Sequence, residues 1–217
     1  DLNRLGSDGG ILNLLKDGTT VGSIGAEGGD LVIGTGSTAG LQFNDATPTI
    51  RPWNMSANTR TDGVCDLGYS NSRFKDLYLS GGVYLGGTGS ANKLDDYEEG
   101  TFTPTLLGGG TLSIYKAEYT KIGDTVTIFL GGSITTVGGS TVQITLPFNS
   151  KATESVGSIM LNNVNISDST KGLCSYTHNA NYFVFYQSRD STPWSALQSD
   201  QVSSGDNFIV TMTYKVA

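Results

Sequence analysis

Four carboxylic acids gather near the middle of the chain, at Asp95, Asp96, Glu98 and Glu99. Two carboxylates about 5–9.5 Å apart can supply the acid and the base or nucleophile of glycoside hydrolysis. Neighbouring acids in a loop also form solvated linkers or hold a cation, and no D-x-[DN]-x-[DN]-G calcium loop accompanies these. We expect a linker without catalysis, and a cation bound at Asp95–Glu99 stays open.

The remaining residues with catalytic potential lack the partners that their chemistry needs. His178 is the one histidine, and a serine triad would need it with Asp168 or Asp190. No G-x-S-x-G nucleophile turn occurs, so a surface or strand-end histidine is expected. Cys65 and Cys174 lie far apart without a C-x-x-C pattern, which argues against zinc, redox chemistry and an intrachain disulfide. We predict no enzyme, no cofactor and no metal site in this set.

A glycine pattern at Gly34, Gly36 and Ala39 follows a short apolar stretch, as in loose dinucleotide-binding fingerprints. That site requires a helix directly afterwards, whose N-terminus holds the pyrophosphate. The next residues run into Thr47-Pro48 and do not predict a long helix. We therefore predict a glycine turn between two short strands.

Aromatic side chains cluster late in the chain. Alternation over Tyr182–Gln187 places Phe183 and Phe185 on one face of a strand, and Tyr182 and Tyr186 on the other. The polar stretch Ser188–Ser199 predicts a loop that carries Trp194. Exposed rings of this kind suit the C–H faces of sugars, so the candidate ligand-binding residues are Trp194, Tyr186 and Tyr182. The alternative is that they belong to a core or to an interface between copies.

Composition excludes two classes of partner. The net charge is −7, and the 13 Lys and Arg are scattered singly, whereas nucleic-acid binding needs clustered cations. No apolar run approaches the ~20 residues of a membrane span, so no membrane insertion is expected. Because the chain does not begin with methionine, a fragment or a processed product is expected.

The elements that position these residues are predicted to be strands. The chain has 30 glycines, about twice the usual share, and helix-period patterns are nearly absent. Turn signals at Asp17-Gly18, Gly28-Gly29 and Gly34–Gly36 divide the opening stretch. They separate short strands at Ile11–Lys16, Thr19–Ile24, Asp30–Ile33 and Gly40–Phe43.

Each of these short strands offers only two or three large apolar side chains. Strands this small do not bury a closed core alone. We therefore expect residues 1–95 to form an intertwined or stacked β stalk that is stable only as an oligomer, with a small independent domain as the alternative. The prolines at Pro48 and Pro52 predict an edge strand or a bend, and Gly86–Lys93 a flexible connection.

Longer strands are predicted after residue 100, and they alternate between apolar and polar residues. Their number and spacing favour a β-sandwich or jelly-roll head domain over residues 96–217. The expected strands are Thr111–Lys121, Thr125–Leu130, Thr141–Leu146, Ser155–Leu161, Leu173–His178, Tyr182–Gln187 and Phe208–Val216.

Three segments resemble those of phage structural proteins. Asp66–Gly87 (DLGYSNSRFKDLYLSGGVYLGG) is similar to a segment in tail-fibre and other virion proteins of environmental phages. Leu94–Thr105 (LDDYEEGTFTPT) resembles the junction that opens their C-terminal β domain, and Tyr119–Val126 (YTKIGDTV) the hairpin that follows. The resemblance implies a trimeric fibre or spike with a C-terminal β-sandwich head, and it brings no catalytic residue.

From these observations we expect a non-enzymatic, all-β homotrimer on the surface of a phage particle. It would join other virion proteins through its N-terminal side and attach to a host surface, with a glycan as the expected receptor. Two alternatives stay open. One is a head fibre or capsid decoration protein without receptor binding, and the other is a polysaccharide depolymerase.

Overall fold

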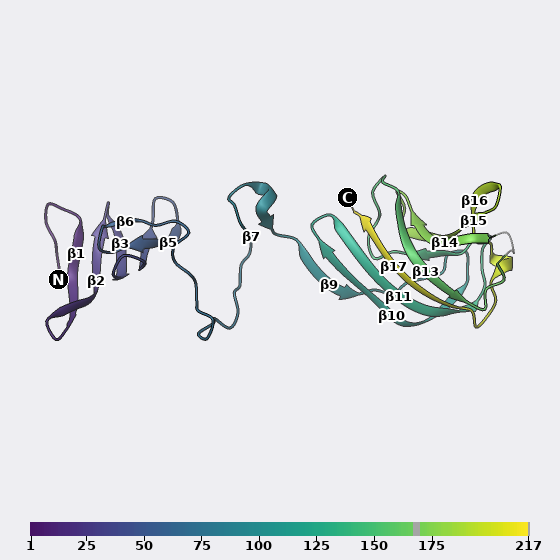
Figure 1. Cartoon of the computed structure of the whole chain (residues 1–217), viewed down its shortest axis with the longest axis horizontal. Coiled ribbons are helices and arrows are strands. Elements are labelled where there is room, and N and C mark those ends of the chain that lie inside the picture. The colour runs from purple at the N-terminus through teal and green to yellow at the C-terminus, as the bar shows by residue number, and fades with distance from the viewer. Residues whose placement is uncertain (167–169, 217) are drawn as a thin grey trace. The chain divides into compact units, whose positions relative to one another are not determined.

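The computed structural model describes residues 1–166 and 170–216. It confirms an all-β protein built from antiparallel strands (Figure 1). Within the described residues, helical structure is limited to two short 3-10 turns, Ser90–Asn92 and Ser199–Gln201. The chain divides into two compact units, Asp1–Tyr78 and Leu79–Ala217, and each is described by itself.

The first unit is one antiparallel sheet of six strands in chain order. The strands are β1 (Gly9–Lys16), β2 (Thr19–Glu27), β3 (Asp30–Thr35), β4 (Ala39–Asn44), β5 (Thr49–Asn54) and β6 (Thr59–Arg60). The predicted turns at Asp17-Gly18 and Gly28-Gly29 are confirmed, and all four residues have positive φ, as tight two-residue hairpins require.

The predicted turn at Gly34–Gly36 is wrong by two residues. Gly34 and Thr35 continue β3, because Gly34 pairs with Gly40 and Thr35 pairs with Ala39. The two glycines allow this close pairing, since a Cβ on Gly34 would lie 2.3 Å from the Gly40 Cα. The expectation of a glycine turn between two short strands is confirmed, because β4 and not a helix follows β3.

Two apolar residues, Val32 and Trp53, are almost fully buried in the first unit. They share one face of the sheet, which we call the inner face, with the buried polar residues Asp30 and Gln42. The Asp30 carboxylate accepts hydrogen bonds from the Gln42 amide at 2.9 Å, from the Asn44 amide, and from a backbone N–H. The bond from Asn44 holds the pKa of Asp30 below its usual value.

β5 contains Pro52 and is nearly an edge strand, as its proline predicts. It pairs along its length with β4, but β6 joins it through only two residue pairs, at Trp53 and Asn54. Pro52 therefore does not need to donate to a second ladder.

In chain order, β6 is followed by a small hairpin of β7 (Val83–Tyr84) and β8 (Lys93–Leu94), which belongs to the second unit. The predicted flexible connection at Gly86–Lys93 is its loop, and Leu85 N–H bonds the Asn92 carbonyl at 2.9 Å. The sequence predicts a domain boundary at residue 95, and the two compact units divide after Tyr78. This hairpin lies between those two positions in the chain.

The second unit contains a nine-stranded sheet in the order β12-β15-β14-β13-β17-β11-β10-β9, with β16 beside β15. Its strands are β9 (Tyr97–Thr101), β10 (Thr111–Ile122), β11 (Thr125–Thr136), β12 (Gln143–Thr145), β13 (Ser155–Asn162), β14 (Thr170–Thr177), β15 (Tyr182–Arg189), β16 (Thr192–Ala196) and β17 (Asn207–Lys215). All seven strands predicted after residue 100 are present, with shifted ends, and β9 and β16 were not predicted.

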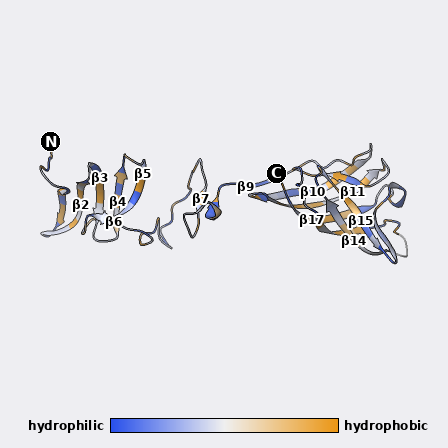
Figure 2. Cartoon of the chain, turned by 90° about the horizontal axis from the view of Figure 1, so that it is seen from above, coloured by the Kyte–Doolittle hydropathy of each residue, from blue (hydrophilic) through white to orange (hydrophobic). Residues whose placement is uncertain are grey.

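This sheet folds over itself into two layers, in a sandwich-like arrangement (Figure 1). Phe185 of β15 lies 6.0 Å from Phe208 of β17 between ring centroids, although β14 and β13 separate their strands in the order. β13 passes between the layers, since Ser155–Gly157 pair with β14 and Ser158–Asn162 pair with β17. Hydrophobic residues line the strands of both units (Figure 2).

Candidate functional site

Three aromatic side chains contact one another on the second unit: Tyr176 of β14, Tyr186 of β15 and Trp194 of β16. Ring centroids lie 5.2 Å apart for Tyr176–Tyr186, 5.5 Å for Tyr176–Trp194 and 5.0 Å for Tyr186–Trp194. These spacings and the edge-on or tilted planes are favourable for aromatic pairs. We call this group the aromatic cluster.

Strand alternation and register bring the three rings to one face. The predicted division of β15 is confirmed, because Phe183 and Phe185 are buried in the core while Tyr182 and Tyr186 are only partly buried. Tyr186 pairs with Ala196 of β16, so Trp194, two residues earlier, shares its face. The cluster therefore stands on three hydrogen-bonded strands. The expected loop for Trp194 is wrong, since the residue lies in β16.

The cluster combines an apolar surface with polar edges. Trp194 is 54% exposed, and the two tyrosines are half-buried beside it. The Tyr176 hydroxyl donates a hydrogen bond to Glu154 at 3.3 Å. Partial burial, then the Glu154 charge, raise the pKa of Tyr176, so its hydroxyl keeps its proton at neutral pH. An exposed ring next to a hydroxyl and a carboxylate can stack on an apolar ligand face and hydrogen-bond its rim.

Tyr182, the third predicted ligand residue, lies away from these contacts. It lines a separate hollow at the start of β15 with Asn149, His178 and Asn181. Its carbonyl accepts a hydrogen bond from the Thr177 hydroxyl at 2.8 Å. Of the three predicted ligand residues, Trp194 and Tyr186 therefore lie in contact and Tyr182 does not. Tyr176 takes the third place in the cluster, and Glu154 beside it was not predicted from the sequence. Nothing in the sequence signals that residues of β14, of β16 and next to β13 come close together.

His178 and Asp190 do not meet. His178 is exposed just before β15 and Asp190 follows its end, so this eight-residue strand separates them by about 25 Å. Asp168, the other acid considered for a triad, lies outside the described residues. The geometry offers His178 and Asp190 no shared catalytic role.

Glu98 and Glu99 lie in a strand, β9, which corrects the linker predicted there, whereas Asp95 and Asp96 lie between β8 and β9. Glu98 and Glu99 are neighbours in β9 and point to opposite faces, so they do not form a facing pair. Each acid has its own partner: Asp95 pairs with Lys93 at 2.9 Å, Asp96 pairs with Lys121, Glu98 accepts from the Tyr119 hydroxyl, and Glu99 accepts from the Tyr97 hydroxyl. Among the described residues, no group of three or more His, Cys, Asp or Glu side chains could hold a metal ion.

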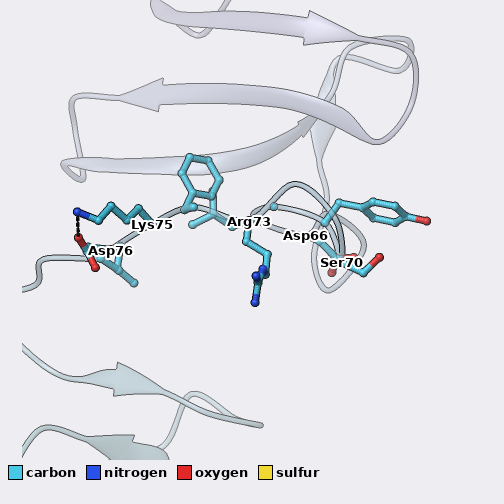
Figure 3. A pocket seen from close by; sticks show the side chains of 10 residues that line it. Asp66, Ser70, Arg73, Lys75 and Asp76 are labelled. Carbon is cyan, nitrogen blue, oxygen red and sulfur yellow. Dashed lines mark ion pairs between the residues drawn. The ribbon is translucent and has the colours of Figure 1, made fainter.

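A hollow of about 840 Å³ lies along residues 66–77 (Figure 3). Its labelled polar side chains point in different directions, with Arg73, Lys75 and Ser70 diverging. Lys75 and Asp76 form an exposed ion pair at 3.7 Å. The wall is an irregular segment with exposed apolar side chains, among them Leu67, Tyr69, Phe74, Leu77 and Tyr78. No converging polar groups in this hollow would orient a small ligand.

The two cysteines are free thiols, Cys65 in the first unit and Cys174 in the second. In the part of the chain that the structure describes, no helix has the length and apolar character needed to cross a membrane. The sequence matches no protein-family model, no curated protein and no solved structure.

Proposed function

We propose that this protein is a non-enzymatic virion structural protein, a homotrimeric phage fibre or spike that attaches to a host surface glycan. Its place is the outside of the particle, joined to other virion proteins through the N-terminal side. The resemblance of Asp66–Gly87 and Leu94–Thr105 to phage virion segments supports the class. The proposal is also supported by the all-β build, with a sheet and an irregular segment followed by a sandwich-like unit.

The aromatic cluster carries the attachment part of the proposal. A sugar offers C–H faces for stacking and hydroxyls for hydrogen bonding, and the cluster offers the exposed Trp194 ring beside the Tyr176–Glu154 pair. The three rings stand on paired strands, so little conformational entropy is lost when a ligand binds. A site this small binds weakly alone, but three copies in one particle fibre raise avidity by about 10²–10⁴.

Binding of the full chain to host cells and to glycans purified from their surface tests this function. Trp194→Ala is expected to lower the affinity about tenfold or more, because an exposed aromatic anchor dominates a small site. Tyr115→Ala is the matched control, since Tyr115 is an exposed aromatic residue of β10 outside the cluster. Equal loss in both variants would show that the cluster is not the site.

Two further results separate the proposal from its rivals. Absence of binding by the trimeric wild-type chain would favour a head fibre or decoration protein without receptor contact. Release of reducing ends from the glycan would favour a polysaccharide depolymerase. Solution mass is the remaining check, and a mass of three chains is expected.

A further inference from the structure

Two rows of apolar side chains cross the first sheet on the face opposite Val32 and Trp53, here called the outer face. In the first row Ala26, Leu31, Phe43 and Ile50 lie opposite one another on β2 to β5. In the second row Leu12, Ile24, Ile33, Leu41 and Pro52 cross β1 to β5. None of these side chains is charged or carries a hydrogen-bonding group.

The outer face lacks a second layer of strands from its own unit. All strands of residues 1–78, which the structure describes throughout, belong to the one sheet. Five side chains of the two rows are exposed, from 38% for Phe43 to 66% for Ile50 with Leu31, Ile33 and Leu41 between, and the other four are half-buried. The buried polar side chains Asp30 and Gln42 lie on the inner face, and on the outer face Thr35, Asn54 and Thr59 lie beyond the two apolar rows. Strands whose apolar side faces water are expected to gain a partner layer.

We propose that the outer face of the first sheet packs against the same face of other copies of this chain. This inference rests on the proposed homotrimeric fibre and names the surface that assembles it. A second copy fits because the rows offer only apolar side chains, and an identical face matches them in chemistry and width. A foreign partner with polar or charged contact residues would find no matching group in either row.

The area agrees with self-association. With a large side chain offering on the order of 200 Å², the exposed parts of Leu14, Leu31, Ile33, Leu41, Phe43 and Ile50 present roughly 550 Å² in each copy. Two such faces bury roughly 1,100 Å², which clears the ~1,000 Å² expected of a specific interface.

The test places two hydroxyls opposite each other in the second row. In the full chain, Ile33→Thr with Leu41→Thr keeps good strand formers but puts unpaired polar groups into the contact. The protein concentration at half assembly, measured by light scattering, is expected to rise tenfold or more. Val156→Thr is the matched control, because Val156 is a similarly exposed strand residue of the second unit. Circular dichroism confirms that both variants keep their strands.

A second measurement does not depend on the stability of these variants. Leu41→Cys is made in a Cys65→Ser, Cys174→Ser background, and maleimide labelling of its thiol is timed at high and low protein concentration. Labelling about tenfold slower in the concentrated, assembled protein is expected, while a thiol from Val156→Cys labels at one rate throughout.

The outcomes separate this interface from the fibre itself. A wild-type trimer whose double variant also assembles normally, with the Leu41→Cys thiol freely labelled, overturns the interface and leaves the fibre proposal standing. A wild-type chain that stays single at all concentrations overturns both. A single chain with a protected thiol means that the chain covers its own face, and it also overturns the interface.

Discussion

The side-chain amide of Asn58 donates a hydrogen bond to the carboxylate of Glu27 at 2.6 Å. Glu27 ends β2 and Asn58 lies in the turn after β5, so β3 and β4 separate them in the sheet. A flat sheet would hold these residues apart, and their contact shows that the sheet curls toward its inner face. Trp53, whose indole N–H approaches the Asn58 side-chain oxygen at 3.4 Å, lies under this link.

Breaking this link is expected to loosen the curl. Asn58→Gly removes the hydrogen bond but accepts the positive φ of 52° at this position, so it should cost about 1 kcal/mol of unfolding free energy. Asn58→Ala should cost more, because alanine also strains at this φ. Trp53 fluorescence during urea unfolding measures the free energy of unfolding of both variants. If the alanine variant is as stable as the glycine variant, the alanine is not strained at this position.

The Asp124 carboxylate should make stability depend on pH. It accepts hydrogen bonds from Lys215 at 2.6 Å and Lys151 at 3.2 Å, and these lower its pKa to about 2. A lowered folded-state pKa stabilises the protein above the ordinary value of 3.8, and this contribution disappears as the pH falls toward 2.

Asp124→Asn should therefore melt at a lower temperature than wild type between pH 5 and pH 7, roughly where an unshifted carboxyl is ionised. The melting temperatures of wild type and Asp124→Asn should become equal as the pH approaches 2. Asp200→Asn, at an exposed acid of the same unit, serves as the control. A gap that persists unchanged at the lowest pH would contradict the role of the Asp124 charge.

Phe185 ties the two layers of the second unit together. Its ring is 1% exposed and contacts Phe183 and Phe208 at centroid distances of 5.5 Å and 6.0 Å. Phe185→Ala should destabilise the unit by about 3–5 kcal/mol, because the ring leaves a cavity between the layers. Phe129→Ala removes the same ring from a position that is 40% exposed, so its effect on urea unfolding should be much smaller.

Tyr214 combines burial with a reciprocal pair of backbone contacts. Its hydroxyl donates to the Phe148 carbonyl at 3.2 Å and accepts from the Phe148 N–H at 3.4 Å. Tyr214→Phe keeps the ring but leaves these groups unpaired, at a cost of about 1–2 kcal/mol near neutral pH.

Burial raises the pKa of Tyr214 above its usual value. A raised pKa favours the protonated folded state, and that preference is lost as the pH rises through the ordinary tyrosine value of about 10 and beyond. The stability difference between wild type and Tyr214→Phe should therefore narrow in alkaline solution. A difference that widens there would show that the hydroxyl is not protected by burial.

Local chemistry was enough to predict most strands. Residues with positive φ at Asp17-Gly18 and Gly28-Gly29 specify tight turns by themselves. Alternation in β15 separates Phe183 and Phe185 from Tyr186, because the period of a strand is two whatever its neighbours are.

Cross-strand register could not be predicted in the same way. Trp194 meets Tyr176 only because β16 pairs with β15, and β15 with β14, in one particular alignment. Glu98 and Glu99 are strand residues because β10 pairs with them, with Lys121 opposite Glu98. These pairings depend on bulges and on residues of other strands, which local propensity does not encode.

The divided pairing of β13 has a consequence for how the second unit comes apart. One continuous strand is hydrogen-bonded to both halves of the sandwich, so neither half can peel away without breaking bonds to its own neighbour or to this shared strand. Loss of one layer therefore removes the support of the other, and the second unit is expected to melt in a single step, without a surviving half.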